Sequence, residues 1–135
     1  MKTIGITGGI GAGKSLVLDY LKERYGAVVI VADRLAHELE RPGQACYTRL
    51  IEAFGENILD ENREIDKIRF AAMIFSDAKA LEKTNEIIHP AVKEEILRRI
   101  KLQEEAGTAL FVVEAALLIE EGYYKILSEL WYIHT

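Results

Sequence analysis

The sequence predicts an α/β fold in which a parallel sheet is flanked by helices and carries one helical insertion. Three observations point to it. A β-branched run at residues 3–7 stops at a glycine cluster, a helical pattern follows from Lys14, and an apolar run fills residues 27–32. Strand, helix and strand within about thirty residues make one βαβ unit. A strand that is apolar at every position is typical of a parallel sheet covered on both faces.

The first helix is predicted to run from Lys14 to just before Gly26. Val17, Tyr20 and Leu21 fall on one helical face, and Gly26 stands where a helix stop is expected. Two later apolar runs, at residues 109–113 and 130–134, predict the third and fourth strands.

Between the second and third strands, residues 34–107 are predicted to form a helical insertion within a single domain of residues 1–135. Pro42 and Gly43 break the helical pattern once. The elements predicted after this break are an amphipathic helix around residues 47–54, a polar loop at 60–64, and helices at about 66–75 and 77–88.

Pro90 predicts a break in the last part of this insertion. A proline disfavours helical geometry in the residue before it, so we expect a corner at His89. A further helix should then carry Val92, Ile96 and Ile100 on one face.

Composition and charge indicate which partners and which cellular compartment to expect. The net charge is −5, and a nucleic-acid surface needs clustered Lys and Arg, so no nucleic-acid partner is expected. No apolar run reaches the ~18 residues that span a bilayer, and the N-terminus meets glycine too early for a secretory signal. The single cysteine, Cys46, cannot form an internal disulfide. We therefore expect a cytoplasmic protein without a membrane partner.

The glycine cluster carries the phosphate-binding motif G-x-x-x-x-G-K-[ST], between a predicted strand and a predicted helix. Glycines let the backbone turn its N–H groups toward phosphate oxygens, and the helix directs its positive end to the same point. Lys14 can then reach the β- and γ-phosphates of ATP, and the Ser15 hydroxyl can ligate Mg²⁺. The predicted nucleotide-binding residues are Gly9, Gly11, Ala12, Gly13, Lys14, Ser15 and Leu16.

The motif does not identify the phosphate acceptor. The D-x-x-G and N-K-x-D elements of GTPase switches and the LSGGQ element of transporter ATPases do not occur, which favours a small-molecule kinase. Such a kinase needs a carboxylate to orient or deprotonate the acceptor hydroxyl. Asp33 lies just past the second predicted strand, at the sheet edge where ligands gather. It could equally be the N-cap of a helix beginning at Arg34.

The P-loop text ITGGIGAGKS resembles that of the dephospho-coenzyme A kinases, which catalyse the last step of coenzyme A biosynthesis. Further landmarks of this family occur in the expected order over nearly the whole chain. They are the Asp-x-Asp motif at Val31-Ala32-Asp33, Pro42-Gly43, Phe54-Gly55, Phe75-Ser76-Asp77, Ile88-His89-Pro90, and the Pro-Leu-Leu-x-Glu element at Ala116-Leu117-Leu118-Ile119-Glu120.

The resemblance implies an adenylate-kinase-like P-loop NTPase fold and transfer of the ATP γ-phosphoryl group to the 3′-hydroxyl of dephospho-coenzyme A. Residues 1–135 are then expected to be a single P-loop kinase domain, incomplete at its C-terminus, with residues 34–107 as its helical substrate-binding insertion. It implies that Asp33 is the catalytic base and acts with Lys14. The substrate-binding residues that it implies are Asp33, His89, Leu117, Leu118 and Glu120. Leu117 and Leu118 could instead be core residues, and His89 could simply turn the chain.

Two more side chains could belong to the site. His37 lies one helical turn beyond Asp33, although a solvated helix histidine is the commoner arrangement. Glu114, at the end of the third predicted strand, could assist Mg²⁺ through water, as a Walker-B acid does.

The sequence departs from the family pattern at three places. Val31 replaces the first Asp of the motif, Ala116 replaces the proline, and the chain stops at Thr135, where the family continues with an arginine-bearing lid, a last strand and adenine contacts. We therefore expect residues 1–135 alone to bind phosphate weakly, to be nearly inactive as a kinase, and to self-associate through an exposed sheet edge. Another small-molecule P-loop kinase, and a nucleotide-binding module without transfer activity, remain as alternatives.

Overall fold

The computed structural model describes residues 1–8, 13–118 and 120–133, and the chain divides into two compact units. The first unit comprises Met1–Asp33 and Lys93–Thr135, and the second comprises Arg34–Val92. The second unit starts at the same residue as the predicted helical insertion, but it ends before that insertion does.

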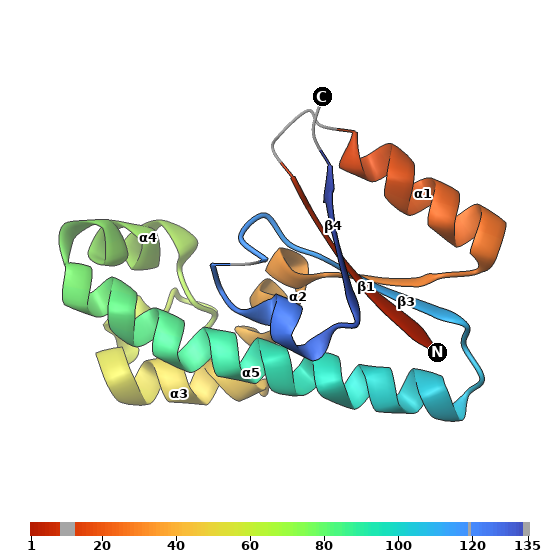
Figure 1. The fold of residues 1–135 in the computed structure, drawn as a ribbon. Helices are drawn as coiled ribbons and strands as arrows, with labels where there is room; N and C mark the ends of the chain where they lie inside the picture. The colour runs from red at the N-terminus through yellow and green to blue at the C-terminus, as the bar shows by residue number, and fades with distance from the viewer. Residues whose placement is uncertain (9–12, 119, 134–135) are drawn as a thin grey trace. The chain divides into compact units, whose positions relative to one another are not determined.

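The first unit is built on a four-stranded parallel sheet (Figure 1). Its strands are β1 (Lys2–Gly8), β2 (Val28–Val31), β3 (Leu110–Glu114) and β4 (Glu129–Ile133). They lie in the order β2-β3-β1-β4, and every pairing is parallel. The predicted parallel sheet is therefore confirmed, with the first strand of the sequence between the third and the fourth.

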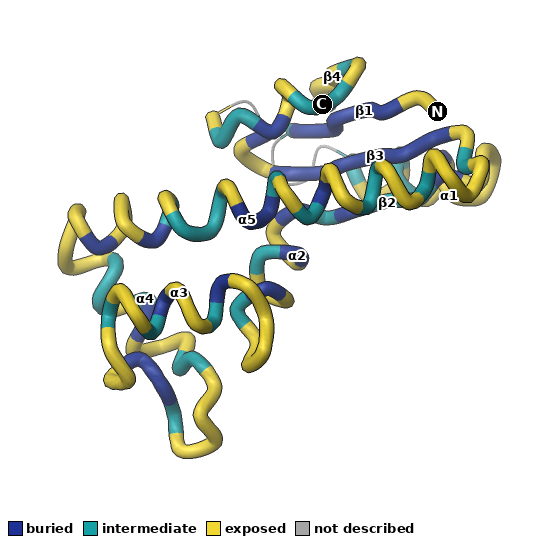
Figure 2. Tube along the Cα trace, turned by 90° about the horizontal axis from the view of Figure 1, so that it is seen from below, coloured by how far each residue is buried: buried dark blue, intermediate teal, exposed yellow. Residues whose placement is uncertain are grey.

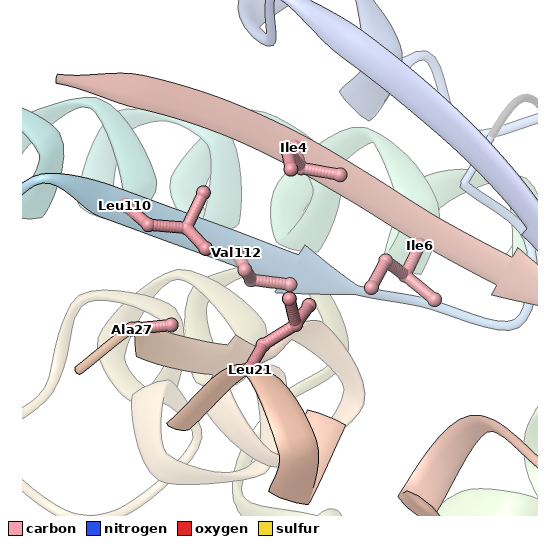
Figure 3. Close-up of a cluster of buried hydrophobic side chains, with 6 residues drawn as sticks. All are labelled: Ile4, Ile6, Leu21, Ala27, Leu110 and Val112. Carbon is pink, nitrogen blue, oxygen red and sulfur yellow. The ribbon is translucent and has the colours of Figure 1, made fainter. Parts of the chain in front are cut away.

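Helix α1 (Lys14–Tyr25) covers one face of this sheet. Successive strand residues point to opposite faces, so Ile4 and Ile6 of β1 share the face that Leu21 of α1 packs against. Figure 3 shows this cluster, in which Leu21 points from the helix toward the strands. The helix ends at Gly26, where φ is 63° and the backbone N–H donates to carbonyls of the last turn. The predicted helix stop is therefore confirmed.

Burial differs between β2, which the sequence predicts to be covered on both faces, and its neighbour β3. All five residues of β3 are buried (Figure 2), as expected for a strand between two neighbours. In β2 only Ile30 is buried, so the prediction for this strand is wrong in part. The reason is its place in the sheet, because β2 lies at the edge and pairs only with β3 among the described strands.

Strand β4 is held against β1 by a compact set of polar contacts. The Ser128 hydroxyl donates to the Thr3 carbonyl at 2.7 Å, and the Ser128 N–H donates to the Thr3 hydroxyl at 2.9 Å. At the other end, a Cβ on Gly8 would lie 2.2 Å from the carbonyl oxygen of Ile133, so only glycine lets the two strands meet there. Three successive residues of β4 expose large apolar side chains, namely Leu130, Trp131 and Tyr132, and Tyr132 is 62% exposed.

The second unit is helical. Its elements are most of α2 (Ala32–Leu39), α3 (Ala45–Phe54), the 3-10 helix η1 (Glu56–Ile58), α4 (Lys67–Ser76) and the first part of α5 (Ala78–Glu105). The predicted loop at 60–64 is confirmed, and a single bridge between Leu59 and Ile65 closes it. Asp66 caps α4 by accepting hydrogen bonds from two backbone N–H groups. No helix among the described residues has the length and apolar character needed to cross a bilayer.

The predicted corner at His89 is wrong, because α5 continues through Pro90. A proline inside a helix removes one hydrogen bond and costs about 3 kcal/mol. Residues on both sides of it are buried, among them Thr84, Val92 and Ile96. Full burial of one such apolar side chain contributes about 1.5–3 kcal/mol, so Val92 and Ile96 together contribute about 3–6 kcal/mol and offset the local cost. Packing therefore keeps the helix continuous.

Candidate active site

The carboxyl ends of three strands lie at one edge of the sheet. Glu114, the last residue of β3, pairs in register with Ile6 of β1 and with Val31 of β2. Because the strands are parallel, the segments that follow them leave from this same edge, where ligands of open α/β sheets bind. Lys14 follows β1 and Asp33 follows β2. The fold thus brings the predicted phosphate-binding lysine and the predicted base to one edge.

The most informative contact at this edge joins Lys14 to Glu114. The Lys14 Nζ atom lies 2.7 Å from Glu114 Oε1, and the two side chains are only 18% and 11% exposed. The sequence singled out Glu114 as an aid to Mg²⁺ and missed this ion pair. A signal for it was present, since a lone acid ending a wholly apolar strand needs a cation if it is to be buried.

The described part of the phosphate loop begins at Gly13, directly before α1. Its φ of 85° is left-handed, which glycine adopts without strain, and it lets the chain enter the helix at Lys14. Ser15 and Leu16 are exposed in the first turn of α1, and that turn contains no acidic residue. The positive end of the helix is therefore not offset by a carboxylate of its own first turn. Gly9, Gly11 and Ala12 lie outside the described residues.

Asp33 is exposed in the first turn of α2. That helix begins at Ala32, so Asp33 is not the N-cap of a helix beginning at Arg34, and this interpretation is wrong. The helix starts earlier because β2 ends at Val31 and the backbone turns without a linker. A carboxylate in a first helical turn is still favoured by the helix dipole. Within the described residues no side-chain hydrogen bond engages Asp33, so its oxygens are available to a ligand.

The segment after β3 separates the two adjacent leucines. Leu118 is fully buried, and a Cβ on Gly5 would lie 2.7 Å from its Cδ2 atom. Leu117 is 52% exposed, and Glu120 is also exposed. Of the two leucines, only Leu117 therefore presents its side chain to a ligand, while Leu118 packs on β1.

The second unit contains a cavity of about 800 Å³ lined by α2, α4, α5 and the segments between them. Its wall combines apolar side chains, such as Phe70 and Ile88, with polar ones, such as His37 and Asn85. Burial raises the pKa of the Glu40 carboxyl in this wall, although His37 and Lys67 oppose the shift.

The two predicted histidines occupy different environments in the second unit. The His37 side chain is 64% exposed, and its Nδ1 atom lies 3.7 Å from a Glu40 carboxylate oxygen. His89 is partly buried inside α5 and is not among the residues that line the cavity. Of these two histidines, His37 is therefore the one that a ligand in this cavity would contact.

Comparison with known proteins agrees with the family that the sequence resembles. A family model described as dephospho-CoA kinase matches residues 2–135. The dephospho-CoA kinase of Aquifex aeolicus is 41% identical over 100% of this chain and 67% of its own length. That of Shouchella clausii is 35% identical over 98% of this chain and 66% of its own length.

A solved structure gives independent support for the fold. The dephospho-CoA kinase from Campylobacter jejuni superposes with a TM-score of 0.76 over 98% of this chain and 66% of its own, at 24% identity. This likeness shows the P-loop NTPase fold. The chain spans about two thirds of the length of the curated relatives that it matches. With the family model covering nearly every residue, this chain belongs to the dephospho-CoA kinase family.

Proposed function

We propose that the protein transfers the γ-phosphoryl group of ATP to the 3′-hydroxyl of dephospho-coenzyme A and so makes coenzyme A. The observation that carries this proposal is the position of Lys14. It is the lysine of the P-loop motif, starts α1, and shares one sheet edge with the exposed carboxylate of Asp33. Membership of the dephospho-CoA kinase family supports the choice of acceptor.

On the donor side, the chain supplies positive charge and hydrogen-bond donors. The Lys14 ammonium group would bind the β- and γ-phosphate oxygens. The first turn of α1, which contains no acidic residue, would contribute the positive end of the helix dipole. The exposed hydroxyl of Ser15 is an oxygen ligand of the kind that Mg²⁺ accepts beside phosphates. When bound, Mg²⁺ would neutralise charge on the phosphate oxygens.

On the acceptor side, Asp33 is proposed as the base. As the 3′-oxygen forms its bond to the γ-phosphorus, the bond from that phosphorus to the β-phosphate oxygen breaks, and ADP leaves. The proton of the hydroxyl passes to the Asp33 carboxylate. The exposure of this carboxylate, and its freedom from other side-chain hydrogen bonds within the described residues, support this role.

We assign the acceptor-binding role to the second unit, because its cavity combines apolar and polar walls. A ligand with both an apolar arm and amide groups would find partners in side chains such as Ile74 and Asn85. His89, Leu117 and Glu120 stay part of the proposed acceptor contacts. Leu118 would act by supporting this segment from the core.

A module that binds nucleotide without transfer is the second candidate, and Val31 favours it. The family motif has an acid at this position, whereas here β2 ends in an apolar residue, so the motif itself supplies no second carboxylate beside Asp33. Bound ATP without turnover would support this module.

We also propose that the protein is cytoplasmic and that it self-associates. The buried thiol of Cys46 suits a reducing cytoplasm. The exposed apolar side chains of β4 would support self-association, which sedimentation can measure.

The decisive experiment measures ADP release by the full-length protein with dephospho-coenzyme A and, separately, with a panel of nucleosides. Replacing Lys14 by Ala should slow turnover ~100-fold, because one preorganised charge contact contributes about 3 kcal/mol to the barrier. Lys22→Ala, which removes an exposed lysine of the same helix, is the matched control and should change little. Equal turnover of a nucleoside and dephospho-coenzyme A would contradict the assigned acceptor.

A further inference from the structure

We propose that Glu114 is a positioning residue that holds the Lys14 ammonium group before an anion binds and releases it to the phosphate oxygens. This inference deepens the proposed function, since it concerns regulation of the same phosphate site. The sequence suggested a different role, as a partner of Mg²⁺ through water.

The geometry distinguishes this ion pair from a surface pair of the same unit. Lys14 and Glu114 meet at 2.7 Å with side chains 18% and 11% exposed. Lys2 and Glu129 meet at a similar distance, 2.8 Å, but with side chains 56% and 40% exposed. Water screens the exposed pair strongly and the enclosed pair weakly, so only the enclosed pair should restrain its lysine appreciably.

The position of Glu114 explains why it needs a cation. It ends a strand whose five residues are all buried, and in the described structure Lys14 is the partner that its carboxylate has. A carboxylate removed from water without a partner is costly, so the unliganded protein gains by keeping the ammonium group beside it.

Anion binding must then compete with this arrangement. An ammonium group has three N–H donors, and phosphate oxygens that recruit them weaken the bond to Glu114. The negative charge of Glu114 also repels the arriving phosphate. Pairing with Glu114 should therefore lower the affinity of the free site for phosphates, and the penalty should depend on Lys14.

The test removes the charge of Glu114 but keeps its shape. In the full-length protein with Mg²⁺ chelated, Glu114→Gln should bind inorganic tripolyphosphate about tenfold more tightly by calorimetry, which is the effect of losing one charge-assisted hydrogen bond. In a Lys14→Met background the same substitution should tighten binding clearly less, because only the direct repulsion by the Glu114 charge is then removed. Glu129→Gln, which removes an equal charge from the exposed pair with Lys2, should have no effect.

Each other outcome overturns the proposal. Equal tightening in both backgrounds would show simple repulsion, and weaker binding in Glu114→Gln would show that the carboxylate aims the lysine at phosphate. A change seen only with Mg²⁺ present would favour the metal role. Circular dichroism checks folding, and if the Gln variant does not fold, Glu114→Asp must show a smaller change of the same sign. Because binding is the readout, failure of dephospho-coenzyme A turnover would reject the proposed function separately.

Discussion

Replacing Leu118 by Ala tests whether this family element works through the core or through the substrate. Leu118 is fully buried and faces β1 at Gly5, where the strand has no side chain. Substitution by alanine removes the isopropyl end of this side chain and leaves a cavity that backbone atoms cannot fill.

Substitutions of buried leucine by alanine cost about 2–5 kcal/mol, depending on how well the site collapses. The bare backbone at Gly5 limits that collapse, although Leu127 can move in part. We therefore expect the free energy of unfolding to fall by about 3 kcal/mol or more. A domain with ~5–15 kcal/mol of stability would remain folded.

Urea unfolding followed by circular dichroism measures this loss, and the neighbouring residue supplies the control. Leu117→Ala changes a side chain that is 52% exposed, so its effect on stability should stay within about 0.5 kcal/mol. If Leu117 contacts the acceptor, this variant should instead raise the KM for dephospho-coenzyme A. Equal losses of stability in both variants would refute the assignment of Leu118 to the core.

A double-mutant cycle identifies the neighbour of Leu118. Alanine at Gly5 would place its Cβ 2.7 Å from both Leu118 Cδ2 and Leu127 Cδ1, so Gly5→Ala alone should destabilise by about 1–3 kcal/mol. With Leu118→Ala present, one of these clashes is gone and the new methyl group fills part of the cavity. The double variant should then be more stable than the sum of the single effects predicts.

Three further predictions concern single ionisable groups. Asp33→Asn should keep ATP binding but lower turnover at least ~100-fold, and normal turnover in steady-state assays would remove Asp33 from the chemistry. Burial, aided by Glu40, raises the pKa of the Cys46 thiol to about 11, so the native protein should react with Ellman's reagent far more slowly at neutral pH than the urea-unfolded chain. Burial also raises the pKa of Glu40, so the folded state keeps a proton that the unfolded chain releases, and stability should fall as pH rises from the ordinary carboxyl pKa through the raised one. Glu40→Gln should remove this slope in urea titrations and be the more stable protein at neutral pH.

The features that sequence predicted well are local ones. The P-loop spacing, the β-branched run of β1 and the stop at Gly26 each depend on a few adjacent residues, and β1 and α1 appear in the structure where these patterns put them. The apolar runs similarly located β3 and β4 to within a residue. The error at Pro90 arose because a local preference of known size was outweighed by burial of residues on either side of it.

Pairings between distant residues were beyond sequence reasoning. The apolar strand before Glu114 indicates that its carboxylate needs a cation, but it does not identify Lys14, since the pair forms only when β3 and β1 align. Edge position is likewise a property of the whole sheet, so the composition of β2 could not show that its outer side lacks a neighbour. The hydrogen bond between Ser128 and Thr3 likewise joins residues near opposite ends of the chain.

The small side chains on one face of β1 explain how the chain tolerates Ala116 where the family has proline. The Thr7 hydroxyl, one residue before the end of β1, donates to the backbone carbonyl of Ala116 at 3.1 Å. Two residues back, Gly5 leaves room for Leu118. Proline and alanine carry the same carbonyl, so the contact that ties the segment after β3 to the strand that leads into the phosphate loop survives the replacement. Alanine lacks only the fixed φ of proline. The segment is instead restrained on both sides of Leu117, because Thr7 binds the carbonyl of Ala116 and Leu118 packs at Gly5.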